Sequence, residues 1–150
     1  MVKNMAAKTE KNPKRELQAK YFQYQILKQQ MAAYLEEKTI IDERINELNM
    51  TIDALHKMDD VKNNQEMWSS LGSGAFVRSD IKDVQKVMIS LGAGIVSKET
   101  KERCIEILQS RLEEITKIEH DMMTDLTNIS QAIQKLEPEL ELLAHRAKNE

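Results

Sequence analysis

Two glycine-containing segments are the part of this 150-residue sequence that most resembles a ligand loop. Ser-Leu-Gly-x-Gly occurs at 70–74 and again at 90–94, and the two copies hold all four glycines of the chain: Gly72, Gly74, Gly92 and Gly94. A dinucleotide loop needs a third glycine at the start of a helix, and a P-loop needs Gly-Lys-Ser/Thr. Neither pattern is present, so we interpret the four residues as turn glycines, which enter positive φ at no steric cost.

No other residues show the spacing of a reactive site. The three histidines, His56, His120 and His145, are scattered along the chain, and neither a Gly-x-Ser-x-Gly nor a His-Glu-x-x-His motif occurs. Cys104 is the single cysteine, which excludes an intrachain disulfide, and no histidine or aspartate pattern around it suggests a nucleophile. We therefore predict no catalytic residue, no metal site and no cofactor, and hence no enzyme.

Composition favours long helices over a packed globule. Charged residues make up 31% of the chain and aromatic residues 4%, with two prolines. The net charge is −3 with both signs interspersed, which argues against a nucleic-acid partner. The longest charge-free stretches, 67–77 and 87–97, are too short for the ~20 residues of a membrane span. Because the N-terminus also lacks the apolar core of a secretory signal, we expect a soluble, cytoplasmic protein with no membrane partner.

Heptad patterns flank the glycine segments on both sides. The first helix is expected to begin at Asn12-Pro13 and to stop near Asn63-Asn64. Its a positions are Leu17, Tyr24, Met31, Lys38, Ile45 and Ile52, and its d positions are Lys20, Leu27, Tyr34, Ile41, Leu48 and Leu55. The second begins near Ser97 or Thr100, with a positions at Ile105, Leu112, Glu119, Leu126, Ile133, Leu140 and Ala147 and d positions at Leu108, Ile115, Met122, Ile129, Leu136 and Leu143. Such seams predict a coiled coil.

Two seams of similar length most simply fold back as an antiparallel helical hairpin, although each helix could instead seek a separate partner. In the hairpin, Lys38 and Glu119 (or Asp121) arrive at nearly the same height, so we predict that they pair and fix the register, unless each is solvated independently. Pro138 lies at an f position, where it either kinks the second helix or opens a short final segment.

Between the helices, four short strands are expected at 67–71, 75–81, 86–91 and 94–97, which make two tandem β-hairpins. We therefore divide the chain into a disordered lead (1–12), a first helix (13–60), a hairpin insert (61–98) and a second helix (99–150). Isolated two-stranded ribbons are marginal in water, so the hairpins either pair with other subunits in a shared β-barrel body or fold back on their own helices. The expected subunit interface comprises Trp68, Leu71, Phe76, Val77, Val87, Ile89, Leu91, Ile95 and Val96.

The order helix, Leu-Gly-Ser-Gly-Ala-Phe-Val, Ile-Lys-Asp, Val-Met-Ile-Ser-Leu-Gly-Ala-Gly-Ile-Val, helix resembles a prefoldin α subunit of the archaeal type. The resemblance covers residue 14 to the end and is most specific at 71–96. It implies a hexamer with two α and four β subunits, coiled-coil arms on a double β-barrel, and an ATP-independent chaperone. Such a holdase captures unfolded client proteins and passes them to a group II chaperonin.

If the resemblance holds, clients are bound at the arm tips, the helix ends farthest from the hairpins. Phe22 at f, Ile26 at c and Leu142 at c point away from the seam, although singly exposed apolar residues are common. The full expected client-binding set is Leu17, Tyr21, Phe22, Ile26, Leu140, Leu142 and Leu143. The alternative is a structural or tethering coiled-coil protein that binds no clients. Neither the client range nor the role of residues 1–12 follows from the sequence.

Overall fold

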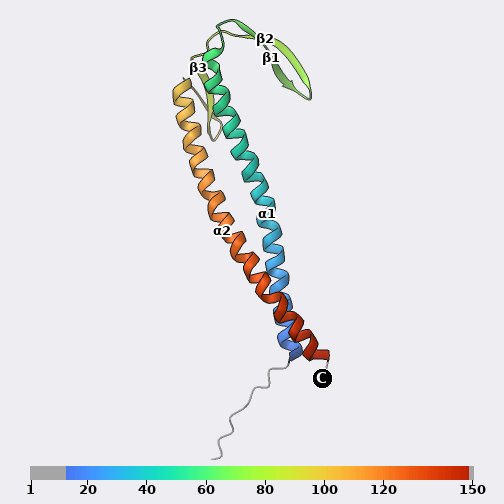
Figure 1. The fold of residues 1–150 in the computed structure, drawn as a ribbon. Helices are drawn as coiled ribbons and strands as arrows, with labels where there is room; N and C mark the ends of the chain where they lie inside the picture. The colour runs from blue at the N-terminus through green and yellow to red at the C-terminus, as the bar shows by residue number, and fades with distance from the viewer. Residues whose placement is uncertain (1–12, 149–150) are drawn as a thin grey trace, which may run out of the picture. The chain divides into compact units, whose positions relative to one another are not determined.

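A computed structural model describes residues 13–148 of the chain, and the predicted lead at 1–12 lies outside the described residues. Two long helices, α1 (Pro13–Lys57) and α2 (Lys101–Lys148), flank a short 3-10 turn (Met58–Asp60) and four strands in the order shown in Figure 1. The strands are β1 (Gln65–Gly72), β2 (Ala75–Ile81), β3 (Lys86–Gly92) and β4 (Ile95–Thr100). The mainly helical class with two β-hairpins is the predicted one.

The chain forms two compact units, each with a segment of both helices. The terminal unit comprises described residues 13–39 and 120–148, and the hairpin unit comprises 40–119. In the terminal unit Lys20 pairs with Glu139, whereas the Tyr34 hydroxyl donates to Asp125 Oδ2 at 3.5 Å. Residue numbers rise along α1 as they fall along α2, so the two segments are antiparallel.

Burial confirms the predicted heptad register in both helices. All twelve a and d positions of α1 and all thirteen of α2 are buried or half-buried, whereas most of the surrounding positions are exposed. This follows from helical geometry, because residues three and four apart lie on one face. Lys38 and Glu119 are both half-buried at their seam positions, and the pairing between them stays a prediction.

The helix α2 continues through Pro138 to Lys148, so no separate final segment begins at this proline. Pro138 is exposed, in agreement with its f position. A proline there leaves the carbonyl of Gln134 without its usual i+4 donor, and an outward position lets water replace that donor.

The four strands form two separate antiparallel hairpins, β1–β2 and β3–β4. In the first, Trp68 is opposite Arg78; in the second, Met88 is opposite Lys98. The bounds of β2 are the predicted ones, and β1 and β3 extend one or two residues beyond the predicted bounds. Strand β4 begins one residue later and ends three residues later than predicted. The start of α2 is fixed by Thr100, whose hydroxyl accepts the backbone N–H of Arg103 at 3.2 Å as an N-cap.

The buried core of the hairpin unit joins both helices to one hairpin. It contains Leu48 and Leu55 of α1, Cys104 and Leu108 of α2, and Ile89 of β3. Partly buried side chains pack around these five, among them Ile52, Val87, Ile105 and Leu112. The β3–β4 hairpin is therefore part of the core of this unit.

Candidate functional site

Both hairpin turns show the backbone geometry that the repeated motif predicts. In the first turn, φ is +49° at Ser73 and +79° at Gly74; in the second it is +50° at Ala93 and +76° at Gly94. Positive φ at two successive central residues is the requirement of a type I′ turn, which matches the twist of the flanking strands. The first glycine of each motif also has positive φ and lies at a register shift, the position of a β-bulge.

The β1–β2 hairpin exposes apolar side chains on both faces. Trp68 and Phe76 share one face, and Trp68 is 69% exposed. Met67 and Val77 lie on the other face, where the hydroxyls of Ser69 and Ser79 are 2.6 Å apart. Exposed apolar surface of this kind marks an interaction site. In the single chain these side chains remain exposed, although apolar side chains of this size are usually buried.

The β3–β4 hairpin is packed differently, and this corrects part of the predicted interface. Ile89 is 8% exposed and half-buried Val87 lies beside it, so both face the helices of their own chain. Arg111 of α2 donates to the carbonyl oxygen of Ser90 at 2.7 Å and holds the same strand. The expectation that Ile89 meets a neighbouring subunit is therefore wrong, because its side chain is already buried. On this face, β3–β4 folds back on the helices of its own chain, which is the second of the two alternatives that the sequence left open.

The other expected interface residues remain on the surface. Those exposed are Trp68, Leu71, Phe76, Val77, Leu91, Ile95 and Val96. Met88, which was not predicted, is also exposed at 70% and lies on the outer face of β3–β4 with Val96. The signal that identifies it is strand alternation, because Met88 points opposite to Val87 and Ile89.

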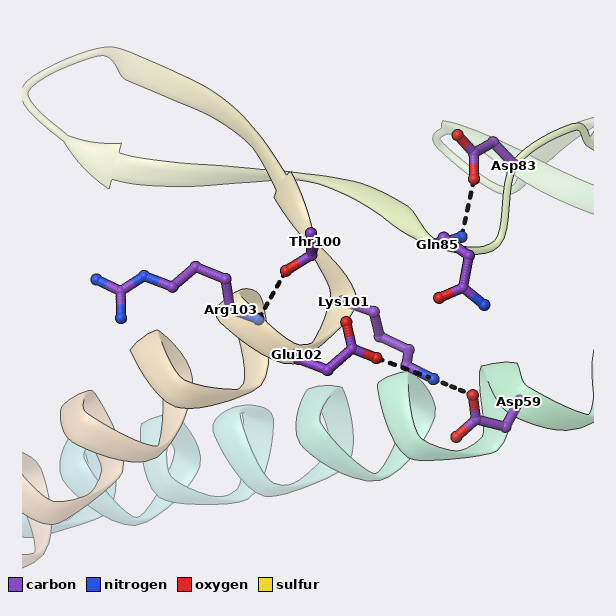
Figure 2. A network of polar contacts seen from close by, with 7 residues as sticks. All are labelled: Asp59, Asp83, Gln85, Thr100, Lys101, Glu102 and Arg103. Carbon is purple, nitrogen blue, oxygen red and sulfur yellow. Dashed lines mark hydrogen bonds and ion pairs between the residues drawn. The ribbon is translucent and has the colours of Figure 1, made fainter.

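A polar network connects the 3-10 turn after α1 to the start of α2 and to the segment between the hairpins (Figure 2). The Lys101 side chain is 6% exposed and pairs with Asp59, with Glu102 at 3.8 Å. Hydrogen bonding to Asp59 is the largest influence that raises the pKa of Lys101 above its ordinary value. The backbone N–H of Lys101 also donates to the carbonyl of Gln85 at 3.0 Å. Sequence reasoning missed this residue, since a buried lysine looks like any other surface lysine in a charged helix.

Four of the seven residues expected at the client-binding site are exposed. Phe22 is 68% exposed, Leu142 is exposed as well, and Tyr21 and Ile26 are also on the surface. Leu143 is buried, however, and so is not available for contact with another chain in this packing. Leu17 and Leu140 are half-buried at their seam positions.

An apolar groove, which we call the end groove, lies at the end of the terminal unit that carries Pro13 and Lys148. Its volume is about 520 Å³, and its walls include Leu17, Tyr21, Tyr24, Leu140 and Ala144. The groove brings together Leu17, Tyr21 and Leu140, three of the residues expected at the client-binding site. Tyr24 was assigned to the seam, and Ala144 was not predicted. Apolar groups at a and e positions on one side of the seam are the pattern that indicates such a groove.

Neither metal nor nucleophile chemistry is favoured by the described residues. Within 13–148, no group of three His, Cys, Asp or Glu side chains is placed to hold a metal ion. Cys104 is fully buried, and burial followed by the nearby Glu99 charge raises the pKa of its thiol. A neutral thiol in an apolar core is a packing residue. None of the described helices is both long and apolar enough to cross a membrane.

Comparison with known proteins shows the family of the chain. The family described as Prefoldin subunit matches residues 27–145. The chain belongs to the prefoldin family. A prefoldin subunit alpha of Methanosarcina barkeri is 36% identical over 117 residues, 78% of each chain. A prefoldin subunit alpha of Methanococcus vannielii is 29% identical over 126 residues, 84% of each.

The fold is also found in a solved prefoldin structure. A chain from the filamentous PFD of Methanocaldococcus jannaschii superposes with a TM-score of 0.67 at 16% identity, covering 75% of this chain and 93% of that one. Prefoldins are a chaperone family whose subunits form oligomeric complexes. The exposed β1–β2 hairpin and the outer face of β3–β4 are accordingly candidate assembly surfaces, and the exposed residues of the terminal unit are candidate client contacts.

Proposed function

We propose that this chain is the α-type subunit of an ATP-independent holdase that captures unfolded proteins through its terminal unit. In this proposal two copies assemble with four β-type subunits through the hairpins, in a shared β-barrel body. The complex acts in the cytoplasm and passes its clients to a group II chaperonin. The relatives named prefoldin subunit alpha support the subunit type.

The observation that carries the proposal is the exposure of Phe22, Ile26 and Leu142 near one end of a helical pair. These side chains lie outside the seam, so their exposure is not required for the two helices to pack. Each one contributes roughly 25 cal/mol per Å² of apolar area that it buries against a client. Such contacts are individually weak, and a client is retained because several arms on one body raise the effective concentration of the remaining contacts.

Release then needs no nucleotide, since each contact dissociates independently and can be replaced in turn. A chaperonin with its own apolar surface competes for the same client side chains. The assembly surface is separate in sequence from the client contacts, which allows the two properties to be tested separately.

The test replaces Phe22, Ile26 and Leu142 by Ser and measures suppression of aggregation of a chemically unfolded client. The matched control is Met50→Ser, which removes a 74% exposed apolar side chain in the hairpin unit. We expect the triple variant to form a complex of unchanged mass with a β-type subunit and to lose suppression several-fold, whereas the control retains it. Unchanged suppression in the triple variant contradicts the client contacts. A tethering protein would instead form a self-contained dimer and suppress no aggregation.

A further inference from the structure

The two hairpins repeat one pattern of exposed residues. Alignment of the two Ser-Leu-Gly-x-Gly copies places Met88 at the position of Trp68, and the two side chains are 70% and 69% exposed. The residue directly opposite each one is a cation, Arg78 in the first hairpin and Lys98 in the second. Directly opposite residues share a face of the ribbon. Each hairpin therefore exposes one large apolar side chain beside a cation.

Met88 supplies the larger part of the apolar surface on the outer face of β3–β4. The residues of this face are Lys86, Met88, Ser90, Val96, Lys98 and Thr100. Met88 and Val96 are its two apolar members, and Val96 is 53% exposed. They lie diagonally across the two strands, where side chains remain within reach of one another. A change in polarity at Met88 therefore alters most of the apolar area that this face can bury against a partner.

The thioether of Met88 is the oxidisable group of this face. Hydrogen peroxide transfers one oxygen to such a sulfur: the S–O bond forms as the O–O bond breaks, and the second oxygen keeps both protons and leaves as water. The sulfur gives up two electrons, which reduce the peroxide. The sulfoxide that results is polar and chiral, and it disrupts apolar interfaces. The neighbouring hydroxyl, ammonium and aliphatic groups do not take up this oxygen.

The equivalent position of the first hairpin carries no sulfur, because Trp68 has an indole there. Met67 precedes it but lies on the other face of β1–β2, opposite Ser79. Met50 is 74% exposed at an f position of α1, outside both the seam and the hairpins. Among the exposed methionines of residues 40–119, Met88 is therefore the one at the repeated position.

We propose that Met88 is a sulfoxidation site that controls assembly of this chain. A peroxide oxidises Met88 in the unassembled chain, and the sulfoxide prevents the outer face of β3–β4 from packing against a partner subunit. This inference rests on the proposed function, because it requires assembly through the hairpins. In the complex the same side chain is covered and protected from the oxidant. The modification therefore acts on chains that have not yet assembled and leaves existing complexes intact.

The experiment treats the isolated chain with hydrogen peroxide, removes the peroxide with catalase and then adds a β-type subunit. Native mass measures the fraction of the chain in the complex, and peptide mass locates each added oxygen. The variant M88L removes the thioether while nearly conserving side-chain volume. The matched control M50L makes the same replacement at the exposed methionine of α1.

We expect peroxide to lower complex formation roughly tenfold in the unmodified chain and in M50L, because a polar sulfoxide would be buried without a hydrogen-bond partner. M88L should assemble equally well before and after treatment. Equal loss of assembly in treated M88L overturns the inference, as does full assembly of the unmodified chain with Met88 oxidised. In both cases the untreated complex still forms, so only this inference fails. If the untreated, unmodified chain forms no complex, the proposed function fails too.

A second measurement does not depend on a variant. Peroxide is added to the preformed complex and to the isolated chain, and the oxidation rates of Met88 and Met50 are followed by peptide mass. Met88 should be oxidised at least about tenfold more slowly in the complex, since access to a covered side chain requires opening of the interface. Met50 should keep its rate and serves as the internal control. Equal rates for Met88 in the two states would show that assembly leaves it uncovered, which overturns the inference.

Discussion

Packing in the core accounts for Cys104, the single cysteine, whose thiol could otherwise suggest a functional role. Its side chain is fully buried between the helices and β3, with Sγ 4.0 Å from the Val87 carbonyl oxygen. Burial raises the pKa of the thiol above its ordinary value, so less of the reactive thiolate is present at any given pH. Burial and the raised pKa both make the Cys104 thiol less reactive.

We predict that Cys104 in the folded chain reacts with a thiol reagent at pH 8 at least about 100-fold more slowly than in the denatured chain, since reaction requires opening of the core. The measurement is the rate of labelling by absorbance, with the chain in concentrated guanidinium as the control. Labelling of the folded chain at a rate close to the denatured one would show that the core around Cys104 is open.

At the residue scale, the seam and turn residues could be predicted from the sequence because each depends on a local rule. Heptad spacing predicts that Leu48 and Leu108 lie in the seam, and the repeated Gly-x-Gly pattern predicts that Gly74 and Gly94 lie in turns. The inward direction of Ile89 could not be predicted in this way. Strand alternation separates two faces of a hairpin, but it does not say whether an apolar face meets its own helices or another subunit.

At the scale of elements, the two hairpins share a motif but differ in the residues that face inward. Alignment of the two Ser-Leu-Gly-x-Gly copies places Ser69 where the second hairpin has Ile89, and Val77 where it has Ser97. In the first hairpin, Ser69 bonds with Ser79 across the strands at 2.6 Å. In the second, Ile89 enters the core beside Leu48 and Cys104. A branched apolar side chain at this position explains why β3–β4 is docked on the helices.

This difference predicts unequal effects for two neighbouring substitutions in β3. Ile89→Ala should lower the free energy of unfolding by about 2–4 kcal/mol, because it leaves a cavity in a packed core. Met88→Ala is the matched control: its side chain is 70% exposed, and its effect should stay within about 0.5 kcal/mol. Urea unfolding followed by circular dichroism measures both. Equal losses in the two variants would show that β3–β4 is not anchored through Ile89.

At the scale of the whole molecule, the candidate surfaces differ in how far the sequence predicted them. The exposure of Phe22 and Leu142 follows from their f and c positions, so the heptad register is sufficient to predict it. The exposure of Leu35 and Met123, which lie at e positions beside the seam, needs a further fact, namely how far the facing helix covers them. The packing of side chains between the two helices decides this exposure, and the heptad pattern of one helix does not predict it.

Assembly of the molecule can be followed through Trp68, the single tryptophan of the chain. It is 69% exposed on β1–β2, where an unpaired two-stranded ribbon gains stability from a partner. We predict that its fluorescence emission moves to shorter wavelength, and that a soluble quencher loses access to it, when a β-type subunit is added. The control is an unrelated helical protein at the same concentration, which should change neither signal. If a complex forms by mass while the emission of Trp68 stays that of an exposed indole, then β1–β2 is not the surface through which this chain assembles.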